Sequence, residues 1–169
     1  MKRRPLPRHD SIKSIVLPRF FGTNLDNQEN EHSIHSTEFV SNLITVIENF
    51  RPKNGPKFSP SVVFNSLAQP GIYRTVGNMK NVQKLRLFID DNYKNPNRYV
   101  RVLMGEGDLN VLTSLLKMFL RELETPVIPK EILNSEKKNE SAAKILNSLG
   151  GAKQKILDSL IVQGRLEII

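Results

Sequence analysis

Arg74 lies between two glycines in residues 71–77, which read GIYRTVG. The glycines favour a turn, and packing of the apolar Ile72 can fix its base, so that the guanidinium is held out into solvent. A guanidinium stays protonated and offers a planar fork of donors that suits carboxylates and phosphates. The segment therefore predicts either a cation presented to another molecule or, as for most exposed arginines, a solvated side chain.

Two further cations, Lys117 and Arg121, are four residues apart in a segment with helical periodicity. This spacing places both on one face of a helix, where like charges repel by roughly 0.2–0.5 kcal/mol. Two explanations stay open: Glu124 offsets the repulsion, or the fold or a partner supplies a carbonyl, carboxylate or phosphate group. Together with Arg74, this layout suits a protein that inserts positive charge into the active site of another protein.

The 169 residues do not offer a complete catalytic site of their own. The chain has no cysteine, which excludes disulfides, thiolate zinc sites and a cysteine nucleophile. No Ser/His/Asp or paired-carboxylate arrangement stands out, and no glycine-rich phosphate loop ends in Lys-Ser/Thr. His32 and His35 lie in a polar stretch without ligand spacing, so we expect solvated loop histidines and no metal site.

The charge balance is strongly basic, with a formal net charge of +8. Such a surface favours anionic partners, but the interleaving of basic and aromatic residues typical of nucleic-acid binding is absent, so no specific nucleic acid is expected. We expect residues 1–19 to be a flexible basic segment, because Lys2, Arg3, Arg4 and Arg8 lie among prolines. This segment could contact an anionic membrane. No apolar run approaches the roughly 20 residues of a transmembrane segment, so we predict a cytoplasmic chain, with membrane recruitment left open.

Apolar residues recur at three- and four-residue spacing and predict an all-α fold. A first helix, capped by Ser36 or Thr37, is expected to run to Phe50, and a second is expected to open at Gly77-Asn78. The strongest periodicity, over residues 109–123, predicts a helix capped by Asp108.

Loops and two short C-terminal helices complete the expected fold. Residues 24–36 and 91–99 are polar and are predicted to be loops, the second because it also holds Pro96. Short helices are predicted over residues 142–149 and 152–162, separated by two glycines.

Two motifs, in this order, resemble the Rho GTPase-activating protein (RhoGAP) domain. The first is Gly-Ile-Tyr-Arg-x-x-Gly, and the second is Asp-Leu-Asn-Val-x-x-x-Leu-Leu-Lys-x-Phe-Leu-Arg-Glu-Leu-x-x-Pro. The segment FGTNL at residues 21–25 is also similar to the opening element of that family. The likeness runs from about Phe20 to Pro129 and more weakly to Ile161, and it implies one RhoGAP-like helical domain over residues 20–169.

The resemblance assigns a role to each matching position. Arg74 matches the arginine finger of the family, and Lys117 and Arg121 match two helix cations that shape the finger loop and meet the bound GTPase. Gly71 and Gly77 match the glycines that let the loop turn. The implied function is a GTPase activator for a Rho-family small GTPase of the Rho, Rac or Cdc42 type. The GTP and magnesium belong to that partner, so the activator needs no cofactor and has no catalytic site of its own.

Three departures from the family pattern bear on activity. Pro70 stands where an acidic residue is usual, Glu124 stands where a proline is usual, and nothing after Ile161 matches the later helices of the family. We therefore expect a domain truncated at its C-terminal end that accelerates hydrolysis weakly unless the missing part is supplied elsewhere. The alternative is a catalytically weak or inactive module of the same fold that binds a GTPase or another signalling partner.

Overall fold

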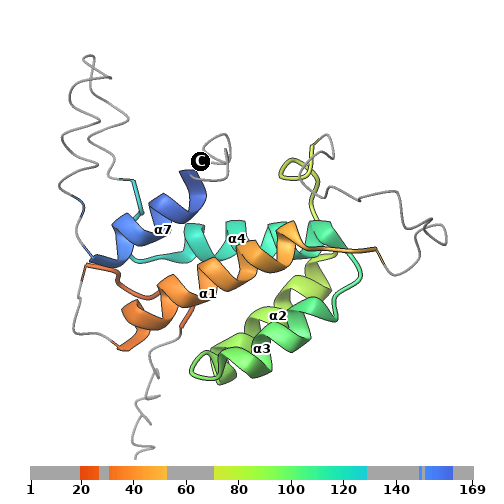
Figure 1. The fold of residues 1–169 in the computed structure, drawn as a ribbon, viewed down its shortest axis with the longest axis horizontal. Helices are drawn as coiled ribbons and strands as arrows, with labels where there is room; N and C mark the ends of the chain where they lie inside the picture. The colour runs from red at the N-terminus through yellow and green to blue at the C-terminus, as the bar shows by residue number, and fades with distance from the viewer. Residues whose placement is uncertain (1–19, 27–30, 53–70, 129–148, 150, 162–169) are drawn as a thin grey trace, which may run out of the picture.

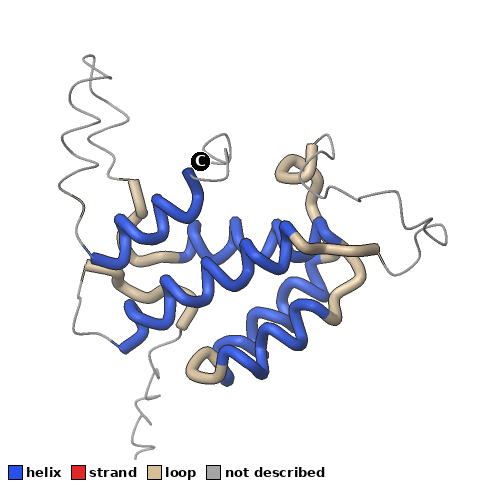
Figure 2. Tube along the Cα trace, viewed as in Figure 1, coloured by secondary structure: helices blue, strands red, loops and turns tan. Residues whose placement is uncertain are grey.

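The structure, a computed structural model, describes residues 20–26, 31–52, 71–128, 149 and 151–161. These ranges contain helices and loops but no strand, which confirms the predicted all-α class (Figures 1 and 2). The expected basic segment over residues 1–19 lies outside the described residues, as does the helix expected over 142–149 except for Leu149. The helices are α1 (Glu31–Glu48), α2 (Met79–Asn92), α3 (Pro96–Met104), α4 (Leu109–Glu122) and α7 (Gly151–Ile161).

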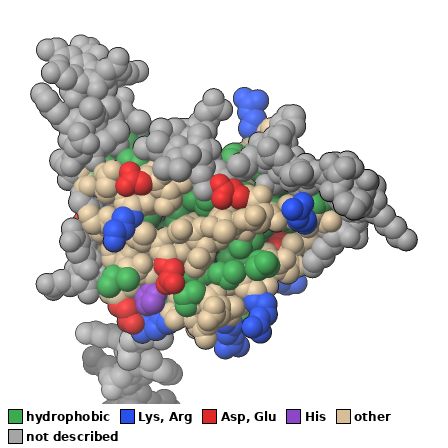
Figure 3. All heavy atoms as spheres, in the orientation of Figure 1, with side chains coloured by type: hydrophobic (Ala, Val, Ile, Leu, Met, Phe, Trp, Pro, Cys, Tyr) green, Lys and Arg blue, Asp and Glu red, His purple; other side chains and the backbone are tan. Residues whose placement is uncertain are grey.

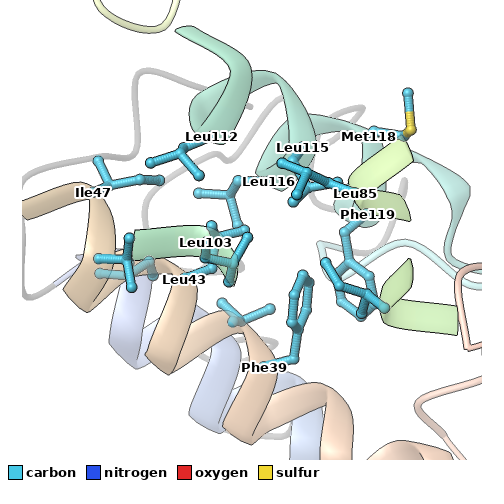
Figure 4. Packing of buried hydrophobic residues seen from close by; sticks show 14 of the residues in the cluster. Phe39, Leu43, Ile47, Leu85, Leu103, Leu112, Leu115, Leu116, Met118 and Phe119 are labelled. Atoms are coloured by element: carbon cyan, nitrogen blue, oxygen red, sulfur yellow. The ribbon is translucent and has the colours of Figure 1, made fainter. Parts of the chain in front are cut away.

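Helix α4 is largely buried and packs against α1 and α2. Asp108 caps its start, because the Asp108 carboxylate accepts a hydrogen bond from the backbone N–H of Asn110 at 2.9 Å, as predicted. Side chains from α1, α2 and α3 pack against α4 in Figure 4. The labelled residues are Phe39, Leu43 and Ile47 from α1, Leu85 from α2, Leu103 from α3, and Leu112, Leu115, Leu116, Met118 and Phe119 from α4. Because α4 is buried on several sides, its backbone is held in place, and the side chains on its remaining face have a fixed position.

Helices α2 and α3 form an antiparallel pair beside α1 and α4 (Figure 1). Helix α2 begins where predicted, with Asn78 as its N-cap and the Asn78 side chain accepting from the Lys80 N–H at 3.0 Å. Arg86 of α2 forms an ion pair with Glu122 of α4, with 2.9 Å between the nearest nitrogen and oxygen. The pair is half-buried, and it ties α2 to the end of α4.

The predicted loop over residues 24–36 is wrong from Glu31 onward, because α1 begins there. Ser36 is buried, and its hydroxyl donates to the His32 carbonyl at 2.6 Å. The His32 ring stacks on Tyr93 with 4.8 Å between centroids, and His35 meets the same ring edge-on at 5.5 Å. The two histidines are therefore half-buried helix residues and not solvated loop residues, since ring packing and local hydroxyl bonds stabilise this polar turn.

The predicted loop over residues 91–99 is confirmed only for residues 93–95, because α2 continues to Asn92 and α3 begins at Pro96. Proline suits the first position of a helix, where no partner for a backbone N–H is needed and its fixed φ is already helical. The Asn95 side chain caps the helix by accepting from the Arg98 N–H at 3.2 Å. Buried Tyr99 and Leu103 then fix α3 to the core, so Pro96 starts a helix here and does not interrupt one.

Helix α7 is close to the prediction of residues 152–162 and packs against α1 (Figure 1). Its buried residues Ile156, Leu157 and Leu160 join the core. The Lys153 ammonium pairs with the Asp26 carboxylate at 2.5 Å, and this bond holds the pKa of Asp26 below its ordinary value. None of the described helices combines the length and apolar character needed to cross a bilayer.

Candidate functional site

The segment from Gly71 to Gly77 begins as a tight turn, as predicted. The Gly71 carbonyl accepts from the N–H groups of Arg74 at 2.8 Å and Thr75 at 3.0 Å. Gly71 has φ +73°, a left-handed conformation that glycine adopts without steric cost. Ile72 is buried, whereas Arg74, Thr75 and Val76 are exposed. The buried Ile72 therefore anchors the turn to the core, and the turn presents Arg74 at the surface.

Gly77 has a different structural role, because its backbone lies directly on the first turn of α4. A Cβ added to Gly77 would lie 2.4 Å from the Val111 nitrogen and 2.5 Å from the Asn110 carbonyl carbon. Real Cβ atoms do not approach backbone atoms this closely, so any other residue at position 77 must displace the turn or the helix. Position 77 therefore requires glycine because of this close packing against α4, and not because of an unusual φ. Figure 1 shows the turn, in yellow-green, beside the end of α4 at which that helix begins.

Three side chains of α4 hold the backbone of the turn by hydrogen bonds. The Lys117 ammonium donates to the Tyr73 carbonyl at 2.8 Å, directly before Arg74 in the chain. The Thr113 hydroxyl donates to the Ile72 carbonyl at 3.1 Å, and the Ser114 hydroxyl accepts from the Gly77 N–H at 3.0 Å. Both sides of the Arg74 turn are therefore bonded to one face of α4.

These contacts answer the question left open for the Lys117–Arg121 pair as far as Lys117 is concerned. The fold supplies a backbone carbonyl to Lys117, and no ion pair between Glu124 and Arg121 is present among the described residues. Burial lowers the pKa of Lys117 below its ordinary value, and the nearby charge of Arg121 lowers it further. Arg121 is exposed, one helical turn beyond Lys117.

The structure thus brings four of the five predicted site residues into one unit, formed by the turn and α4. Gly71, Arg74 and Gly77 belong to the turn, Lys117 binds it, and Arg121 extends the cationic face of the helix away from it. Thr113 and Ser114 were not predicted from the sequence. A usable signal was present, because both lie three or four residues before Lys117 and so continue the polar stripe of an otherwise apolar helix.

The remaining described surface offers basic side chains but no competing site for metal chemistry. Lys and Arg side chains gather over the α2 and α3 pair in Figure 3, where Arg98 and Arg101 are exposed. A hollow of about 390 Å³ between α1 and α3 is lined mainly by apolar and amide side chains, including Phe50 and Met104. No group of three or more His, Asp or Glu residues that could hold a metal ion occurs within the described ranges.

The lowered pKa of Lys117 leads to a prediction about stability at alkaline pH. Below its folded-state pKa, Lys117 is charged in both states, and its burial beside Arg121 disfavours the fold. Between that pKa and the ordinary value of 10.5 the folded chain has already lost the proton that the unfolded chain retains, so stability rises with pH. We expect urea unfolding to show that the wild type gains stability relative to Lys117→Met through this window. A constant difference between the two proteins would contradict the assignment.

Comparison with known proteins adds an independent observation. The model of the RhoGAP domain family matches residues 60–162. Rho GTPase-activating protein 15 of Rattus norvegicus is 31% identical over 153 residues, which cover 86% of this chain and 27% of that protein. WW domain-containing protein tag-325 of Caenorhabditis elegans is 35% identical over 132 residues, covering 74% and 15%. Rho GTPase-activating protein 12 of Homo sapiens is 28% identical over 130 residues, covering 75% and 13%. The chain thus spans 13% to 27% of the length of these relatives.

Proposed function

Because the chain belongs to the RhoGAP domain family, we propose that it accelerates GTP hydrolysis by a Rho-family small GTPase, with Arg74 supplied in trans as an arginine finger. The observation that carries this proposal is the placement of Arg74. It is exposed on a turn whose backbone is bonded to α4 both before and after the arginine. The geometry therefore favours an arginine offered to a partner over a freely moving surface side chain.

The chemistry of GTP hydrolysis explains what such an arginine does. Negative charge develops on the transferring phosphoryl oxygens and on the leaving group, and a guanidinium placed there stabilises the transition state more than the ground state. An arginine supplied in trans is worth about 10³–10⁵ in rate. The GTP, the magnesium ion and the attacking water belong to the GTPase, so the activator contributes charge and position and needs neither a nucleophile nor a base.

The contacts of the turn support this role because they limit how far the backbone of Arg74 can move. Holding a charged group near its productive position lowers the entropy lost on reaching the transition state. Lys117 is engaged with the Tyr73 carbonyl, so its part is to hold the turn. Arg121 is exposed beyond it and is the cation of this helix that is free to meet acidic groups of the GTPase.

A single-turnover assay of phosphate release tests the proposed function. Purified Rho, Rac and Cdc42 are loaded with GTP and mixed with increasing amounts of the chain. We expect at least one of them to hydrolyse GTP faster in proportion to the complex formed, and the one with the largest effect identifies the preferred partner. If the chain binds a GTPase without changing the rate of GTP hydrolysis, it is instead a catalytically inactive module of the same fold. Contact of Lys2, Arg3, Arg4 and Arg8 with anionic membrane stays a prediction, because these residues lie outside the described ranges.

A further inference from the structure

Helix α4 carries two adjacent hydroxyl residues, Thr113 and Ser114, in positions where its other buried residues are apolar. Thr113 is fully buried and Ser114 is 7% exposed. A buried hydroxyl destabilises a fold unless it is hydrogen-bonded, so each must have a partner. Both hydroxyls bond to the backbone of the Arg74 turn, and the Thr113 hydroxyl also bonds within α4.

The two hydroxyls bond to opposite sides of Arg74. The Thr113 hydroxyl donates to the carbonyl of Ile72, two residues before the arginine, and shares this proton with the Asn110 carbonyl at 3.2 Å. The Ser114 hydroxyl accepts from the N–H of Gly77, three residues after the arginine. The exposed stretch of residues 74–76 is thus bracketed by two contacts from neighbouring positions of one packed helix.

From this geometry we infer that Thr113 and Ser114 are positioning residues for Arg74, an inference that rests on the proposed function. Neither hydroxyl touches the reacting phosphate, since both are buried beneath the turn. The Lys117 hydrogen bond goes to the carbonyl directly before Arg74. Thr113 adds a second contact on that side of the arginine, and Ser114 adds a contact on the other side, which Lys117 does not bond to. Without the Ser114 contact, the backbone after Arg74 loses its hydrogen bond to α4 and keeps the bond of the Thr75 N–H to the Gly71 carbonyl and the packing of Gly77 on α4.

The test replaces each hydroxyl by a group of similar shape. We expect Thr113→Val and Ser114→Ala each to lower the kcat of stimulated GTP hydrolysis by about 10- to 100-fold, because the catalytic arginine is misplaced. The KM for the GTP-loaded GTPase should change by less than about twofold. Thr113→Ser keeps the hydroxyl and should retain most of the activity. Ser36→Ala is the matched control, because Ser36 is a buried serine of α1 whose hydroxyl bonds to the His32 carbonyl. Its kcat should equal that of the wild type.

A double substitution separates positioning from general damage to the fold. If Thr113 acts through Arg74, Thr113→Val should have no further effect on the rate in an Arg74→Ala background. A further loss of rate there would show a merely structural role and overturn the inference. Unchanged kcat in both single variants, with Arg74→Ala inactive, would overturn the inference and leave the proposed function standing.

Amide hydrogen exchange at Gly77 tests the contact without reference to GTP. In the wild type this N–H should exchange slowly, because it is buried and bonded to the Ser114 hydroxyl. Ser114→Ala should speed its exchange, whereas Ser36→Ala should not. This result would support the contact even if no GTPase responds to the chain, in which case only the proposed function fails. Fast exchange at Gly77 in the wild type would overturn the contact whatever the rate assay shows.

Discussion

An Arg74→Ala variant should lose most of the acceleration of GTP hydrolysis while retaining much of its affinity for the GTP-loaded partner. The expected loss is about 10³–10⁵ in the stimulated rate, or roughly 4–7 kcal/mol of transition-state stabilisation. The loss falls on the rate because the guanidinium binds charge that appears mainly in the transition state. Single-turnover phosphate release measures the rate, and calorimetry with a non-hydrolysable GTP analogue on the partner measures the affinity.

Two further variants make this experiment specific to the side chain at position 74. Arg74→Lys keeps the charge but loses the planar fork of donors, so we expect it to recover only a small part of the rate. Arg101→Ala removes an exposed arginine from α3, on another element, and should behave as the wild type. Because Arg74 is exposed, its replacement should change the free energy of unfolding by no more than about 0.5 kcal/mol. Full acceleration by Arg74→Ala would show that the proposed finger is wrong.

The elements that present Arg74 could be predicted because their signals are local. A pair of glycines around an apolar residue indicated the turn, and Asp108 ahead of a regular apolar period indicated the start of α4. Each signal depends on residues a few positions apart, whose effect on the backbone hardly depends on the rest of the fold. The same holds for Asn78 at the start of α2.

The parts that could not be predicted depend on contacts between residues distant in sequence. Nothing local shows that His32 stacks on Tyr93, 61 residues away, and so extends α1 into a polar stretch. Pro96 alone fits either a loop or a helix start, and the burial of Tyr99 and Leu103 decides between them. The partner of Lys117 was open for the same reason, because the carbonyl that it binds lies 44 residues earlier in the chain.

Gly71 is required by its local backbone conformation, whereas Gly77 is required by its contact with α4, which is distant in sequence. The two glycines should therefore respond differently to substitution. Gly71→Ala meets no close atom, since its added Cβ would lie 3.8 Å from the Arg74 Cβ, and it mainly forces a side chain into the left-handed region at about 1–2 kcal/mol. Gly77→Ala drives its Cβ into the backbone of Asn110 and Val111. We expect it to cost about 2–3 kcal/mol, in the upper part of the range for overpacking, because a helix backbone cannot move aside as a side chain can. Urea unfolding measures both changes.

Asparagine at the same two positions distinguishes strain of φ from lack of space. Asparagine tolerates the left-handed conformation better than alanine, so Gly71→Asn should be less destabilising than Gly71→Ala. At position 77 the clash concerns the Cβ that both residues carry, so Gly77→Asn should be at least as damaging as Gly77→Ala. We also expect both Gly77 variants to reduce the stimulated rate about 10- to 100-fold, because the turn must leave its place on α4. Equal tolerance of alanine and asparagine at position 77, with activity retained, would show that the turn does not depend on this close approach.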